Sequence, residues 1–117
     1  MRPEASTADF FPEPSCDDDL RLRWRRLVDV TLPEAAKRRT WPVRYNHCFA
    51  RILLDCAVGA PWRTAIEPPA WRRAPTPLLA RAIALGEDCL SGAADLHELN
   101  RQSLAFRRTA ETSLREA

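Results

Sequence analysis

Apolar residues recur every three or four positions through much of the chain, and the densest run lies between Val43 and Val58. On a helix, where each residue turns by about 100°, one face of this run is aromatic and aliphatic, and Ala, Leu and Val cover much of the opposite face. A helix that is apolar on nearly all sides packs at the centre of a fold. The pattern therefore predicts a central helix over 43–58 that stops at Gly59.

Helical spacing also marks the segments on either side. Residues 15–31 begin with a candidate cap, Ser15, and three acids that favour a helix N-terminus, and they bury a stripe from Leu20 to Thr31. The same segment contains a Leu-Arg-Leu-Arg alternation that fits a strand, but no convincing second strand is present to pair with it. A helix is therefore expected here, followed by a short one that Pro33 opens and that runs to Arg39.

Two more helices are expected in the C-terminal half. Thr76 is a candidate cap for a helix that runs to Ser91, before Gly92. A last helix is expected over 94–108, with Leu96, Leu99, Ser103 and Phe106 on its buried face. Residues 60–75 hold four prolines and two tryptophans, which predicts an ordered but irregular connector.

The expected fold class is all-α: a compact single-domain bundle of four or five helices. Its 117 residues fit one domain of ordinary size. Residues 1–14 mix Pro, acidic and small residues without a period and are expected to form a mobile acidic arm, with Phe10–Phe11 as its apolar point. The helical domain is expected over 15–110, with a frayed C-terminal tail over 111–117.

Composition limits the cellular compartments that we expect for this protein. No run of about 18 apolar residues is present, so no membrane span is expected. The first 30 residues lack the pattern of a secretory or transit signal. The four cysteines are widely spaced and three lie in apolar helical stretches, which favours free thiols in a reducing compartment over a disulfide framework. We therefore expect a cytoplasmic protein.

The charge is divided unevenly along the chain. Residues 1–20 hold one basic and six acidic side chains, whereas residues 21–117 hold 17 basic and 10 acidic ones. The basic side chains gather after Leu20 and again around Lys37, which gives a candidate surface for an anionic partner, either nucleic acid or an acidic protein. The alternative is an ordinary solvated face. The residues expected to form the surface are Arg21, Arg23, Arg25, Arg38 and Arg39.

The central helix also carries a polar strip, with Arg44, His47, Arg51 and Asp55 three or four residues apart. It is interpreted either as a structural network, with an Arg51–Asp55 pair, or as a small-molecule site. In such a site His47 would be the acid or base, Asp55 would orient it, and the two arginines would hold an anionic group. Aromatic side chains are the candidate walls of a pocket: Trp41, Tyr45 and Trp62.

Other chemistry is not indicated. Cys48 and Cys56 are about 12 Å apart along an intact helix, too far to share a metal ion, and no close-spaced ligand pair is present, so we expect no metal and no cofactor. No Gly-rich phosphate loop or nucleophile elbow occurs. The leading hypothesis is a small intracellular binding or accessory protein without its own chemistry. The alternative is an enzyme or pathway accessory protein with the polar strip as its site.

Overall fold

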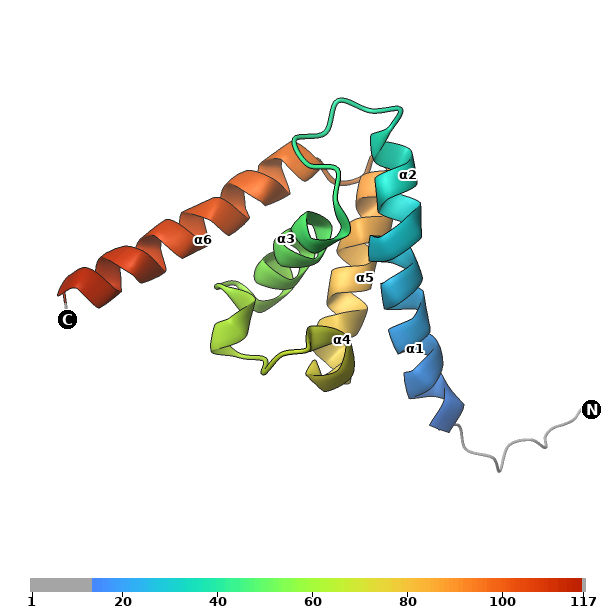
Figure 1. Cartoon of the computed structure of the whole chain (residues 1–117), viewed down its shortest axis with the longest axis horizontal. Coiled ribbons are helices and arrows are strands. Elements are labelled where there is room, and N and C mark those ends of the chain that lie inside the picture. Colours follow the sequence, from blue (N-terminus) through green and yellow to red (C-terminus); the bar gives the residue numbers. More distant parts are fainter. Residues whose placement is uncertain (1–13, 117) are drawn as a thin grey trace, which may run out of the picture.

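The computed structural model describes the backbone of residues 14–116 and the side chains of residues 17–111. Every regular element in this part of the chain is helical, which confirms the all-α fold class (Figure 1). The expected arm, except Pro14, and the side chain of Cys16 lie outside the described residues. The elements are α1 (Pro14–Arg26), η2 (Leu27–Thr31), α2 (Leu32–Ala36), α3 (Asn46–Val58), η3 (Trp62–Thr64), α4 (Ala70–Arg73), α5 (Thr76–Ser91) and α6 (Leu96–Glu116).

The first helical segment does not break before Pro33. Helix α1 continues through one π-helical stretch, η2, into α2, and the N–H of Leu32 donates to the carbonyl of Leu27, five residues back. Proline has no N–H to donate to the helical hydrogen bonds, and its ring crowds the preceding turn. Because the helix widens locally to π geometry just before Pro33, it continues through this residue. The separate helix expected up to Arg39 is thus corrected: the helix ends at Ala36.

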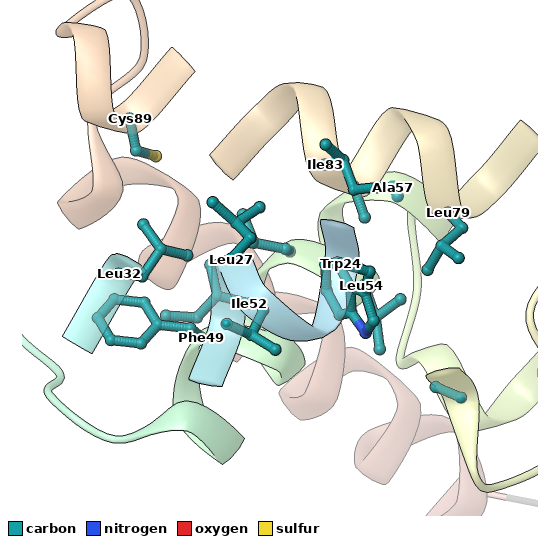
Figure 2. Packing of buried hydrophobic residues seen from close by; sticks show 14 of the residues in the cluster. Trp24, Leu27, Leu32, Phe49, Ile52, Leu54, Ala57, Leu79, Ile83 and Cys89 are labelled. Atoms are coloured by element: carbon teal, nitrogen blue, oxygen red, sulfur yellow. The ribbon is translucent and has the colours of Figure 1, made fainter. Parts of the chain in front are cut away.

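Helix α3 is the central element, as its pattern predicted. It packs against α5, α6 and the α1–η2–α2 helix, and the side chains of Phe49, Ile52 and Leu54 are fully buried (Figure 2). It begins at Asn46, three residues later than expected, and ends before Gly59, whose φ of 85° is a left-handed conformation that glycine adopts without strain.

The connector 60–75 is irregular, as predicted, with two short helical turns, η3 and α4. Its backbone is held by side chains of the long helices. The N–H of Trp62 donates to Asp55 Oδ1 at 2.9 Å, and Arg21 donates to the carbonyls of Trp71 and Ala74, both at 2.9 Å. These bonds place two tryptophans, Trp62 and Trp71, beside α1 and α3.

Helix α5 starts at Thr76, but Thr76 does not cap it. The capping position is Pro75, and the Thr76 hydroxyl donates to Asp17 Oδ1 at 2.8 Å, which ties α5 to α1. This bond and a second from Arg21 lower the pKa of the Asp17 carboxyl. The other end agrees with expectation, since α5 stops before Gly92 in the left-handed region.

Helix α6 is longer than expected. It begins at Leu96, where the Asp95 carboxylate accepts the N–H of His97, and continues to Glu116 instead of ending near Arg108. Leu96, Leu99 and Ser103 are buried as predicted, and Phe106 is half-buried. Its first half packs on α3, and its second half projects away from the other helices (Figure 1).

Candidate functional site

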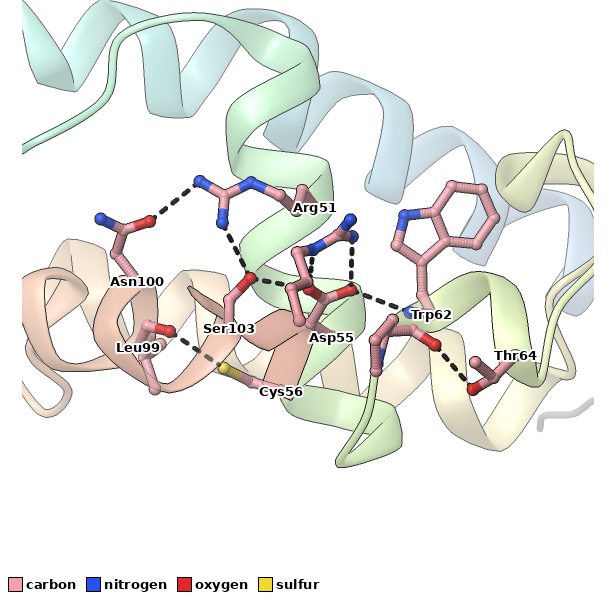
Figure 3. Close-up of polar contacts among 10 residues, drawn as sticks. Arg51, Asp55, Cys56, Trp62, Thr64, Leu99, Asn100 and Ser103 are labelled. Atoms are coloured by element: carbon pink, nitrogen blue, oxygen red, sulfur yellow. Dashed lines mark hydrogen bonds and ion pairs between the residues drawn. The ribbon is translucent and has the colours of Figure 1, made fainter. Parts of the chain in front are cut away.

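The polar strip of α3 is divided between a buried network and the surface. Asp55 is fully buried, and its two carboxylate oxygens accept four hydrogen bonds (Figure 3). Ser103 Oγ donates to Oδ2 at 2.7 Å, and the Trp62 N–H donates to Oδ1 at 2.9 Å. Arg107 supplies the other two, at 2.8 and 3.1 Å. Two oxygens offer about four acceptor positions, so Asp55 has none left for a substrate.

Arg51 does not form the direct pair with Asp55 that the sequence suggested. Its guanidinium donates instead to Ser103 Oγ at 2.8 Å and to Asn100 Oδ1 at 2.9 Å, and Ser103 relays the contact to Asp55. The ionic partner of Asp55 is Arg107. Because α6 crosses this side of α3, its polar side chains reach the buried carboxylate. This part of the strip is a structural network that fastens α6 to α3.

His47 lies apart from that network. It is exposed, at the start of α3, and its ring stacks on Tyr45 with centroids 6.0 Å apart and planes 2° apart. Asp55 is eight residues further on, about 12 Å along the helix axis, and bonds other groups. Asp55 therefore does not orient His47. Arg44 is exposed before α3 and lines a separate shallow hollow with Tyr45.

Three tryptophans meet at one pocket, of which the sequence singled out only Trp62 as a wall. Trp24 comes from α1, Trp62 from η3 and Trp71 from α4, and the hollow between them has a volume of about 320 Å³. Trp41 is not part of it, because it packs edge-on against Phe49 with centroids 5.7 Å apart. The remaining lining residues are the apolar Val28, Ala50, Leu54 and Ala70 and the polar Arg25, Asp29, Asn46 and His47.

The polar residues of the pocket form a connected rim. Asn46 donates to Asp29 Oδ1 at 3.0 Å, and Arg25 Nε lies 3.9 Å from Asp29 Oδ2. The Arg25 guanidinium also sits 4.7 Å from the centre of the Trp71 ring, a cation–π distance. The pocket thus has an aromatic wall, an aliphatic floor and a few placed polar groups, the composition typical of ligand sites.

An exposed apolar stripe lies next to the pocket. Leu22 and Val30 are 67% and 55% exposed, and Arg26 lies midway between them, four positions from each. Residues four apart share a helix face. Arg25 and Asp29 line both the pocket and the shallow hollow beside Leu22 and Val30, so the two hollows lie next to each other. We call the tryptophan pocket together with Leu22, Arg26 and Val30 the α1 face.

Several of the arginines expected to form a basic surface are bonded within the chain. Arg21 and Arg39 donate to backbone carbonyls, those of Cys89 and Leu90 in the case of Arg39. Arg23 pairs with Glu87, although Asp19 lies four residues before it. The arginines without a partner among the described side chains are Arg26, Arg38, Arg44, Arg72 and Arg108.

Two of the three described cysteines are held in their protonated, unreactive form. Cys48, Cys56 and Cys89 are free thiols. Burial, with a smaller effect of nearby carboxylates, raises the pKa of both Cys56 and Cys89 to about 11. A thiol that stays protonated is a poor nucleophile. Among the described residues no group of three potential ligands could hold a metal ion.

Comparison with known proteins adds no relative. No protein-family model matches the chain, and no curated protein or solved structure matches it. In the part of the chain that the structure describes, no helix has both the length and the apolar character needed to cross a membrane.

Proposed function

We propose that this protein is a non-enzymatic binding module whose α1 face recognises an acidic segment of a partner protein through one bulky apolar side chain. The observation that carries this proposal is the pocket itself, where tryptophans from three separate elements surround about 320 Å³. That volume is at the low end of the range for ligand pockets, roughly 300–1,000 Å³, and suits a single large side chain.

The stripe beside the pocket supports a protein partner. Leu22 and Val30 are the two most exposed aliphatic side chains on α1 and η2. Apolar surface that is exposed next to an apolar pocket is typical of protein interfaces, where one anchored side chain and its surroundings supply most of the affinity. A phosphate backbone would gain nothing from these two residues, so nucleic acid is the less favoured anionic partner.

The charge supports an acidic partner. Arg26 lies between Leu22 and Val30 without a described partner, and Arg72 follows Trp71 on α4. The chain beyond residue 20 has an excess of seven positive charges. Carboxylates on the partner would speed its approach and fix its orientation more than they would raise its affinity.

Asn46 and His47 on the rim favour a second candidate, a small aromatic molecule held in the same pocket. A catalytic version of this candidate lacks the partner that was expected for His47, because the Asp55 carboxylate is fully bonded elsewhere. We also propose that the protein works inside the cell, since its described cysteines are unpaired thiols.

The test uses a short dye-labelled peptide with one central Phe between Asp and Glu residues, and measures its binding by fluorescence anisotropy. Matched peptides replace the Phe by Ala, or the acids by Asn and Gln. We expect micromolar binding that weakens at least ~10-fold without the Phe, equal to about 1.4 kcal/mol, and that becomes less salt-dependent without the acids.

Three outcomes would contradict the proposal. The first is equal binding of the Phe and Ala peptides. The second is no peptide binding alongside tight, steeply salt-dependent binding of mixed-sequence DNA or RNA. The third is binding of indole or phenylacetate with no binding of any peptide, which would favour the small-molecule candidate. On the protein side, Arg26→Ala should weaken peptide binding, whereas Arg108→Ala, on α6, should not.

A further inference from the structure

We infer that the chain carries its own competitor for the α1 face: the segment around Phe10 and Phe11 fills the tryptophan pocket of the same molecule until a partner displaces it. This inference rests on the proposed function, since it concerns the regulation of the same site. Three observations support it: the chemistry of the segment, the position of the start of α1 at Pro14, and the distance from Pro14 to the pocket.

The segment has the chemistry that the α1 face would select. Phe10 and Phe11 are its bulky apolar side chains, and Asp9 and Glu13 stand on either side of them. This is an acidic stretch with an aromatic anchor, the class of ligand proposed above. Residues 1–20 as a whole have an excess of five negative charges, opposite in sign to the rest of the chain.

Helix α1 begins on the side of the fold that holds one wall of the pocket. Helix α1 starts at Pro14, and Arg21, seven residues later, donates to the carbonyl of Trp71. Seven helical residues span about 10 Å along the axis. Asp17, close to the start, is tied to Thr76 at the head of α5. The start of α1 is therefore anchored on the side of the fold that holds α4 and Trp71 (Figure 1).

The tether is long enough. Phe11 and Phe10 are three and four residues before Pro14, and an extended chain spans up to about 3.5 Å per residue, or roughly 10–14 Å. Trp24, the α1 wall of the pocket, is ten residues after Pro14, about 15 Å along the helix. Since a phenyl side chain extends the reach of its backbone, one of the two rings can enter between Trp24 and Trp71.

A short tether makes even a weak contact effective. A group attached by a few residues acts as if present at about millimolar concentration, so a segment that binds the pocket with a dissociation constant of about 0.1 mM would occupy roughly nine-tenths of its own sites. A partner must then compete with it. The apparent dissociation constant of the partner rises by one plus the ratio of that effective concentration to the dissociation constant of the segment, about tenfold for these values.

The first test uses the full chain with no partner present. Indole N–H resonances of the four tryptophans are assigned by NMR in the wild type, in Phe10→Ala/Phe11→Ala and in the control Ser6→Ala/Thr7→Ala. We expect the double phenylalanine variant to shift the Trp62 and Trp71 signals and leave that of Trp41, which is outside the pocket, in place. The control should match the wild type. Unchanged Trp62 and Trp71 signals in the phenylalanine variant would overturn the inference.

The second test measures the acidic Phe peptide against the same full-length proteins. Release of the competitor should tighten binding about 10-fold in Phe10→Ala/Phe11→Ala and not in the control. Equal affinity in all three would overturn the inference while leaving the proposed function standing. Indole shifts without any peptide binding would have the opposite meaning: the segment occupies the pocket, and the proposed partner class is wrong.

Discussion

The Asp55 carboxylate accepts hydrogen bonds from α6 and η3, so a single residue of α3 fixes two other elements. A buried charge is tolerated only when it is paired and fully bonded, and all the acceptor positions of Asp55 are in use. The same residue joins the helix that projects from the fold to the connector that carries Trp62. The position of one pocket wall therefore depends on it.

The sequence could predict that Arg51 and Asp55 form a network or a site, because charged residues on an otherwise apolar helix must be bonded. It could not predict which residues complete the network. Arg107 and Ser103 lie 52 and 48 positions after Asp55, and only the crossing of α6 over α3 brings them there. The spacing along α3 indicated Arg51 as the partner of Asp55. Instead, Arg107 on α6 pairs with Asp55 and donates to both of its carboxylate oxygens.

Replacement of this carboxylate should destabilise the fold. In Asp55→Asn the acceptor of the two hydrogen bonds from Arg107 is no longer charged. The amide nitrogen that replaces one carboxylate oxygen is itself a donor, so it faces the donors around it without accepting a hydrogen bond. We expect a loss of about 2–4 kcal/mol, toward the lower part of the range for broken buried pairs because the Arg107 side chain is 40% exposed. Urea unfolding measures the loss. Asp88→Asn, at an exposed site on α5, is the control, and an equal, small effect of both would contradict the network.

The two thiols with raised pKa should be slow to react. At pH 8 a thiol of pKa about 11 is about one-thousandth thiolate, so alkylation of Cys56 and Cys89 in the folded protein should be slow and should rise about tenfold per pH unit. Peptide mapping after timed iodoacetamide treatment measures each rate. Fast labelling of either residue at pH 8 in folded protein would be inconsistent with its buried environment.

The same shifts set a stability trend at high pH. In the unfolded chain these thiols ionise near pH 9, whereas in the folded protein they hold their protons to about 11. Because the unfolded state binds fewer protons in that window, stability falls as pH rises from 9 to 11. Cys56→Ser and Cys89→Ser together should flatten the trend in urea midpoints. An unchanged slope would show that other groups cause it.

Among the elements, periodicity predicted most helices and the buried faces of α1, α3 and α6. Two differences from the expected helices have identifiable causes. The π turn at η2 lets α1 and α2 join across Pro33, and Thr76 bonds Asp17 rather than its own helix. Neither feature follows from the apolar pattern, since one depends on backbone geometry and the other on a side chain 59 residues away.

Three helical elements, η2, α3 and α5, pack closely together at Gly86 on α5. A methyl group there would lie 2.7 Å from Leu27 Cδ2 and 3.0 Å from Leu53 Cδ1. Gly86→Ala gains helix propensity of about 1 kcal/mol but overpacks a buried contact, which costs about 1–3 kcal/mol. We expect a net loss of about 1 kcal/mol in urea unfolding.

A double-mutant cycle separates the two effects. Leu27→Ala removes the obstructing side chain, so Gly86→Ala should become stabilising in that background. Ala84→Gly, at an exposed position of the same helix, measures the propensity difference alone. A Gly86→Ala effect of the same sign and size in both backgrounds would contradict the close contact with Leu27.

At the scale of the whole molecule, the α1–η2–α2 helix, α3 and the connector meet where the pocket opens. Four of its eleven lining residues are polar, and they come from α1, η2 and α3. The sequence identified Trp62 and His47 as candidates but not their neighbours Trp24, Trp71 and Asp29. Tryptophans beside prolines are equally expected in a core, and only the path of the connector shows which of them share a cavity.

A substitution that fills the tryptophan pocket from within shows whether this pocket is the binding site. Ala50 lines the pocket, and Ala80 is an exposed alanine on α5 outside it. The affinity of the acidic Phe peptide is measured for Ala50→Phe, the smaller Ala50→Leu, and the control Ala80→Phe, with thermal melting to check that each is folded. We expect at least ~10-fold weaker binding to Ala50→Phe, an intermediate loss for Ala50→Leu, and no change for Ala80→Phe. Wild-type affinity in a folded Ala50→Phe protein would contradict it.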